Sequence, residues 1–169
     1  MDLQIAPSSQ MSSAFDLTIN GRPMRVNAGE QATLLDVLRN DVGLRATRFG
    51  CGQEQCGACM VLVDGEPAYA CTRLVSTLAG REVVTVEGLA EDGSLEPLQQ
   101  AFIAEQAGQC GFCLSGILVS AKALLDRNPS PSRAEIAAAL DNNLCRCGAH
   151  NRIIRAVQRA AAARSGVRA

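Results

Sequence analysis

Eight cysteines in 169 residues constrain this chain more than any other feature, because they fall into two groups of four. The first group is Cys51, Cys56, Cys59 and Cys71, and the second group is Cys110, Cys113, Cys145 and Cys147. Each group supplies enough thiols to surround a metal centre. The sequence therefore predicts two separate four-thiolate sites, one in each half of the chain.

The first group has the spacing Cys-x4-Cys-x2-Cys with a later cysteine, which is the plant-type ligand pattern of a [2Fe–2S] cluster. Three glycines interleaved with it predict a loop whose backbone N–H groups can approach the cluster sulfurs. These glycines are Gly50, Gly52 and Gly57. Structural zinc is the competing metal, but zinc sites generally pair two CxxC-like turns, so the four-residue gap favours the iron–sulfur cluster.

The second group combines Cys110-x2-Cys113 with Cys145-x-Cys147, a spacing that by itself suits either an iron–sulfur cluster or zinc. An even number of cysteines is also compatible with a scaffold of four disulfides. Residues 1–13 contain neither an apolar signal core nor a paired-arginine export motif, so we expect a cytoplasmic, reducing location. That location favours metal or redox chemistry over disulfides.

The remaining composition excludes several partners. No apolar stretch reaches the roughly 18 residues of a membrane span, so any association with a membrane, or any export, would occur only through a partner protein. The net charge of −1 predicts no binding to nucleic acid. From residue 142 onward, however, the chain has six arginines and no acid, which indicates either a solvated helix face or a docking face for an acidic partner.

Hydrophobic patterning predicts strands in the first half of the chain. Residues 15–26 alternate apolar and polar side chains around a turn at Asn20, which is typical of a β-hairpin. Thr33 can cap a helix that ends before Gly43. Residues 60–71 predict a second hairpin, and residues 83–86 one more strand. Two hairpins, a helix and a final strand predict an α+β domain.

After Gly88 the pattern changes to a helical period. The helices are expected from about residue 96 to 108, from 114 to 127, after a capping box at Ser132 and Glu135, and from about residue 150. The acidic and turn residues at 91–94 mark the boundary. We therefore expect domains at 14–90 and 91–165, with flexible tails at 1–13 and 166–169.

Four segments together resemble the small iron–sulfur subunits of the molybdenum hydroxylases, the xanthine oxidase family. They are residues 50–59, Cys71, the QCGFC run at 109–113 and the NLCRCG run at 143–148. Both sets of four cysteines match that family position by position, and the resemblance covers residues 14 to about 163. Within the family, the runs AFIAEQAGQCGFC, AKALLDRNP and NLCRCGAH resemble the small subunits of two-component nicotinate dehydrogenases and related N-heterocycle or aldehyde dehydrogenases.

The resemblance implies a plant-ferredoxin-like β-grasp domain followed by an all-α four-helix domain, each with one [2Fe–2S] cluster bound by its four cysteines. It also implies a separate large subunit that holds the molybdopterin cofactor and hydroxylates an N-heterocycle such as nicotinate. Electrons would pass from molybdenum to the helical-domain cluster, next to the ferredoxin-like cluster, and out to a flavin subunit or a c-type cytochrome. Gln109 and Cys147 match family residues that approach the pterin.

The chain has no evident substrate site of its own. No Ser/His/Asp or Cys/His constellation accompanies the cysteines, and the lone His150 is interpreted as a helix-start or interface residue. The expected role is that of the redox subunit of an oxidoreductase. The alternatives are the iron–sulfur subunit of an aldehyde dehydrogenase, a stand-alone two-cluster ferredoxin, and a cluster-based sensor, for which the remaining segments are too short.

Overall fold

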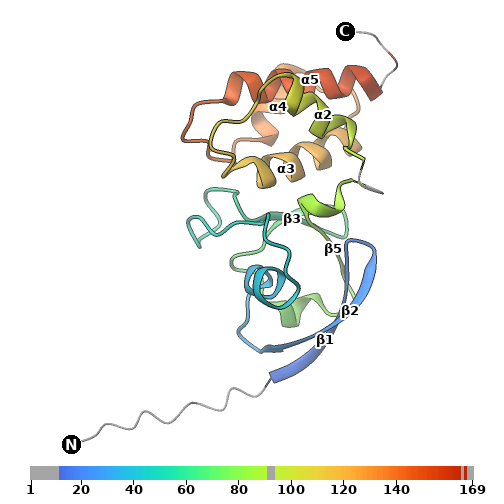
Figure 1. Cartoon of the computed structure of the whole chain (residues 1–169), viewed down its shortest axis with the longest axis vertical. Helices are drawn as coiled ribbons and strands as arrows, with labels where there is room; N and C mark the ends of the chain where they lie inside the picture. The colour runs from blue at the N-terminus through green and yellow to red at the C-terminus, as the bar shows by residue number, and fades with distance from the viewer. Residues whose placement is uncertain (1–11, 91–93, 165, 167–169) are drawn as a thin grey trace, which may run out of the picture.

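The computed structural model describes residues 12–90, 94–164 and 166. A sheet-containing half and a helical half lie one above the other (Figure 1). The predicted boundary at 91–94 lies outside the described residues except for Ser94, as do residues 1–11 and 167–169 of the predicted tails. The first strand begins at Ser12, which pairs with Gly29, so Ser12 and Ser13 belong to the sheet rather than to a tail.

The first half is built on a mixed five-stranded sheet of order β2-β1-β5-β3-β4. The strands are β1 (Ser12–Ile19), β2 (Arg22–Gly29), β3 (Met60–Val63), β4 (Glu66–Tyr69) and β5 (Glu82–Val84). Both predicted hairpins are present, and Asn20 adopts a positive φ of 51° in the first turn. β5 runs parallel to β1 and antiparallel to β3, which joins the two hairpins into one sheet.

Within this half, one helical segment packs on the sheet. It consists of α1 (Leu34–Asp36) and a π-helical turn, η1 (Val37–Asp41), and Thr33 caps it by accepting a hydrogen bond from the Asp36 N–H at 3.2 Å. Its apolar side chains are fully buried in the core of this half. Two short 3-10 turns, η2 (Val75–Leu78) and η3 (Val86–Gly88), complete the connections. The α+β prediction for this half is confirmed.

The second half contains four helices in its described residues. They are α2 (Pro97–Ala104), α3 (Leu114–Arg127), α4 (Arg133–Ala139) and α5 (His150–Arg164). The capping box of α4 forms as predicted, whereas α2 ends four residues before Gly108 because Gln106 adopts a left-handed φ of 47°. None of the helices in the described residues is both long and apolar enough to cross a membrane.

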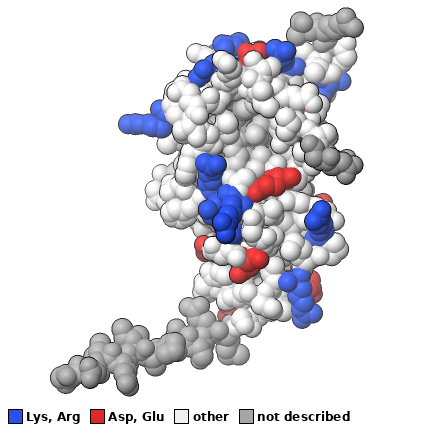
Figure 2. Space-filling view, viewed as in Figure 1, with Lys and Arg blue, Asp and Glu red and all other residues white. Residues whose placement is uncertain are grey.

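Three of the six C-terminal arginines hold α5 against its neighbours. Arg155 and Arg159 bind the two carboxylate oxygens of Glu105 at 3.2 and 3.3 Å. Arg164 forms ion pairs with Glu96 and Asp126 and thereby links α5 to α2 and α3. Figure 2 shows this mixture of basic and acidic side chains at the helical end of the molecule. These contacts give part of the basic segment a role within the fold.

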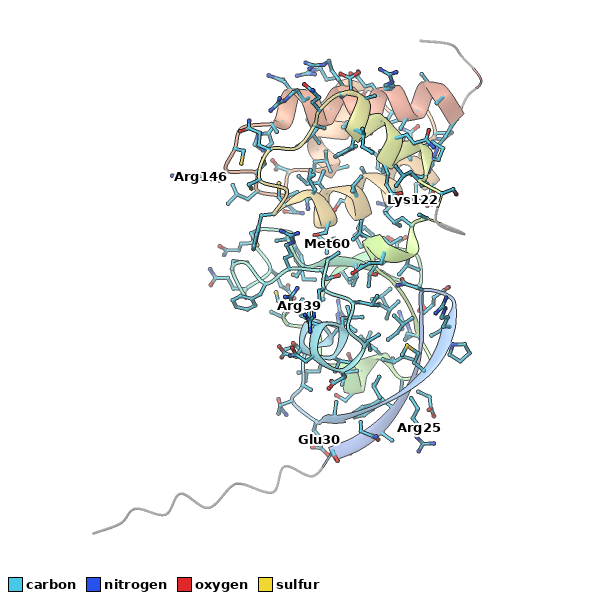
Figure 3. The ribbon with its side chains drawn as sticks, viewed as in Figure 1. Arg25, Glu30, Arg39, Met60, Lys122 and Arg146 are labelled. Atoms are coloured by element: carbon cyan, nitrogen blue, oxygen red, sulfur yellow. The ribbon has the colours of Figure 1, made fainter. Side chains whose placement is uncertain are left out.

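The two halves meet where α3 packs on β3. The contact contains a small apolar cluster: Met60, Leu62, Leu89, Val119 and Ala123. Met60 lies at the level where the halves meet, and Lys122 extends from α3 above it (Figure 3). At one point the backbones are so close that a Cβ added to Gly116 would overlap the carbonyl oxygen of Gly57. We call this contact between α3 and the residue 56–58 segment the seam.

Candidate iron–sulfur sites

The first cysteine group lies on a loop and on the hairpin that follows it. Cys51 and Cys56 belong to the loop before β3, and both are partly buried. Cys59 precedes β3 and Cys71 follows β4, so the β3–β4 hairpin places these two buried thiols near each other. The backbone bond from Ala70 N to Cys59 O, at 3.2 Å, closes the hairpin at this end. One pair of thiols therefore faces outward and one faces the core.

The loop backbone directs N–H groups at the outer sulfurs. Gln53 N and Gln55 N lie 3.4 and 3.2 Å from Cys51 Sγ, and Cys51 N lies 3.3 Å from Cys56 Sγ. The Gln53 and Gln55 N–H groups lower the pKa of the Cys51 thiol from 9.0 to about 7. Burial raises the pKa of the Cys59 thiol to about 12. The loop thus stabilises negative charge on sulfur at its outer side.

The predicted glycines fit this role. A Cβ on Gly50 would lie 2.6 Å from Cys56 Sγ, so only glycine leaves the sulfur free to turn into the loop. Gly52 and Gly57 adopt φ values of 70° and 69°, in the left-handed region. A negatively charged cluster needs a narrow, donor-rich loop of this kind, and the residues present fit one.

The second cysteine group lies at two helix starts. Cys110 and Cys113 precede α3, while Cys145 and Cys147 precede α5. The Sγ atoms of Cys110 and Cys147 are 3.5 Å apart, near the ~3.7 Å expected for two sulfurs bound at about 2.3 Å to one tetrahedral metal. Burial raises the pKa of Cys113 to about 12, whereas the Phe112 N–H and then Cys147 lower the pKa of Cys110. Like the first site, this site combines two thiols that are at least partly exposed with two that are buried.

The thiols approach one another in pairs. In the described residues, no three Cys, His, Asp or Glu side chains are grouped around a position for a single metal ion. A two-iron cluster takes four thiolates, two on each iron, so paired thiols are compatible with it.

Cysteines of both groups line one cavity of about 390 Å³. Its walls include Cys51 and Cys56 from the first group and Cys110, Cys113 and Cys147 from the second. The backbone joins the groups as well, because Leu144 N donates to Cys56 O at 3.0 Å. The sequence indicated two separate sites, and the fold places them next to each other.

Other predicted residues also have defined positions. Gln109 is exposed, and its Nε2 donates to the Cys147 carbonyl oxygen at 3.2 Å, which brings the two predicted pterin-side residues together. His150 is exposed at the start of α5, as expected for a helix-start residue.

Two features of the site were not predicted. Asn143 is buried and donates from Nδ2 to Gly57 O at 3.4 Å, and Arg48 lies over the ring of Phe112. The only sequence signal for Asn143 was its place in the NLCRCG run. Neither contact has a signal in the residue pattern, because each joins residues more than 60 positions apart.

Comparison with known proteins agrees with this architecture. Residues 17–90 match the family described as 2Fe-2S iron-sulfur cluster binding domain, and residues 85–158 match the [2Fe-2S] binding domain. A nicotinate dehydrogenase chain of Pseudomonas putida, one of the subunits of that enzyme, is 48% identical over 154 residues, which cover 91% of this chain and 98% of that protein.

Solved structures share the whole fold. Quinoline 2-oxidoreductase from Pseudomonas putida 86 matches with a TM-score of 0.87 and 40% identity over 92% of this chain and 98% of the matched chain. The aldehyde oxidoreductase of Desulfovibrio desulfuricans matches with the same TM-score and identity over 90% of this chain, but over only 17% of its own length. A ferredoxin-like β-grasp domain followed by a helical [2Fe–2S] domain is thereby confirmed. The chain belongs to the small iron–sulfur subunits of the molybdenum hydroxylases, carries two [2Fe–2S] clusters and is the electron-transfer subunit of an oxidoreductase.

Proposed function

We propose that the two cysteine groups are the ligands of the two clusters. Cys51, Cys56, Cys59 and Cys71 would bind the cluster of the ferredoxin-like domain, and Cys110, Cys113, Cys145 and Cys147 would bind that of the helical domain. Three observations support this assignment: all eight are free thiols, backbone N–H groups point at the outer sulfurs, and Gly50 leaves space beside Cys56. When bound, the clusters supply one-electron carriers.

We further propose that this chain relays electrons from a molybdenum-containing large subunit, through the helical domain and then the ferredoxin-like domain, to a flavin subunit or a c-type cytochrome. The observation that carries this relay is the cavity shared by the two groups, since cysteines of both domains line it. The Leu144–Cys56 backbone bond holds the two cysteine loops at a fixed spacing. A fixed, short spacing favours transfer within the chain.

Gln109 and Cys147 are the proposed entry point for electrons. Gln109 is exposed and its amide already contacts the Cys147 backbone, so an approaching pterin edge would meet both residues at one place. The cysteine pair Cys110 and Cys147 lies on the same outer side of the helical domain.

Hydroxylation of an N-heterocycle such as nicotinate is the proposed overall reaction. Its support is the similarity to quinoline 2-oxidoreductase and to one chain of a nicotinate dehydrogenase. The alternative, an aldehyde-oxidising complex, is supported by the match to aldehyde oxidoreductase, in which the equivalent region is part of a longer chain.

Association with a partner distinguishes this proposal from a stand-alone ferredoxin. Phe49, Ile103 and Leu144 are 62%, 65% and 63% exposed. Contact with a partner would remove the apolar surface of these side chains from water, which is favourable. We therefore expect the chain to copurify with a molybdenum-containing subunit. A stable monomer that does not bind such a subunit would support the alternative of a stand-alone ferredoxin.

The ligand assignment can be tested by metal analysis and low-temperature EPR of the reduced protein. The wild-type chain should show two distinguishable signals. Cys56→Ser should disturb only the first signal and Cys113→Ser only the second, so each variant is the control for the other. A single signal accompanied by one zinc per chain would refute the assignment of the helical site.

A further inference from the structure

Arg48 connects the two cluster-binding regions. Its backbone N–H donates to Ala58 O at 3.2 Å, a bond that closes the base of the loop carrying Cys51 and Cys56. Its side chain crosses to the helical domain, where Cζ lies 5.4 Å from the centroid of the Phe112 ring. Phe112 stands between Cys110 and Cys113 in the chain. A residue of one domain therefore rests on the cysteine loop of the other.

The charge of Arg48 is not neutralised by an ion pair with any described residue, unlike that of Arg155, Arg159 or Arg164. Arg48 is only partly exposed, so water screens it less than a fully exposed cation. Stacking on an aromatic face is favourable for a guanidinium and holds it in place. The result is a fixed positive charge beside the helical-domain cysteines.

The contact places this charge beside Cys110. Cys110 is exposed and, together with Phe112, lines the cavity shared by the two cysteine groups, so the Arg48 guanidinium lies against the loop that carries this thiol. A donor or a cation that stabilises a thiolate also stabilises the more negative, reduced form of a cluster bound to it. The positive charge of Arg48 therefore raises the reduction potential of that cluster.

We propose that Arg48 is a positioning residue through which the ferredoxin-like domain raises the reduction potential of the cluster in the helical domain. It stacks on Phe112, which stands between Cys110 and Cys113 in the chain, and it adds a positive charge without an ion pair to any described residue at the same place. The inference rests on the proposed role of Cys110 as a ligand. It makes the potential of one domain's cluster depend on the docking of the other domain.

The test is an EPR-monitored redox titration of both clusters in the full-length chain, with iron and sulfide content measured for each variant. Arg48→Met removes the charge, Arg48→Lys keeps the charge but not the planar face, and Phe112→Leu removes the ring. Arg25→Met is the control, because Arg25 lies on β2 in the part of the sheet-containing half that is remote from the helical half (Figure 3).

Arg48→Met should lower the reduction potential of the helical-domain cluster relative to the ferredoxin-like cluster. The equilibrium constant for electron exchange between the two clusters should then shift about tenfold toward the ferredoxin-like cluster, which corresponds to about 59 mV for one electron. Arg48→Lys should shift it by less than Arg48→Met, and Arg25→Met should leave it unchanged. Equal potentials in wild type and Arg48→Met, or a shift confined to the ferredoxin-like cluster, would overturn the proposal.

If Arg48→Met does not retain its full iron content, Phe112→Leu decides the question. The proposal then requires Phe112→Leu to lower the potential of the helical-domain cluster, and an unchanged potential overturns it. A wild-type chain without two distinct signals would instead refute the ligand assignment, so the two failures can be told apart.

Discussion

Replacing Gly116 by alanine tests whether the seam fixes the spacing of the two domains. Gly116 lies in the first turn of α3, and an added Cβ would overlap the carbonyl oxygen of Gly57, closer than the 3.0 Å below which real Cβ atoms are not found. The obstacle is backbone, so no side-chain rotation can relieve it. The segment from Cys56 to Ala58 must move away from α3, or α3 must move away from it.

Two effects of opposite sign determine the change in stability. Alanine in place of glycine within a helix stabilises by about 0.5–1 kcal/mol. Overpacking costs about 1–3 kcal/mol. Opening the seam also weakens the bonds from Leu144 N to Cys56 O and from Ser115 Oγ to Ala58 O, each worth about 0.5–1.5 kcal/mol net. We expect a net loss of about 2 kcal/mol, or about 4–8 °C in Tm for a chain of this length.

The assay is thermal unfolding of the cluster-loaded chain, followed by circular dichroism and by cluster absorbance. Gly108→Ala is the matched control, because its Cβ would meet only the end of the Leu114 side chain, at 2.6 Å, and that side chain can rotate. The control should change Tm by less than about 2 °C. An unchanged or raised Tm for Gly116→Ala would show that the seam adapts and would refute this reasoning.

Two further predictions concern the cysteine sites. Gln109→Ala should slow cluster reduction in stopped-flow mixing with substrate while molybdenum reduction in the same complex stays nearly unchanged; loss of molybdenum reduction, or no effect, would contradict the proposed entry point. In the cluster-free chain at pH 8, iodoacetamide should label Cys51 well before Cys59, since the pKa of Cys51 is about 7 and that of Cys59 about 12. Mass spectrometry of the peptides would show this order, and equal labelling would mean that the loop donors do not act on Cys51.

The residue pattern predicted the local features of this protein. Cysteine spacing indicated the first [2Fe–2S] cluster, because ligands a few residues apart must share a loop. Alternating and helical periods predicted both hairpins and the bounds of α3, since each depends on near neighbours. Spacing alone left zinc open at the second group, and the family resemblance was needed to choose the cluster.

Contacts between the domains could not be predicted in this way. The shared cavity, the Gly57–Gly116 approach and the placement of Arg48 over Phe112 each join segments more than 50 residues apart. Their positions depend on how α3 docks on β3, which is decided by apolar side chains that any helix and strand could carry. The sequence therefore determined what each half binds, while the tertiary structure determined how the two halves face each other, because docking is a property of the complete packed surface.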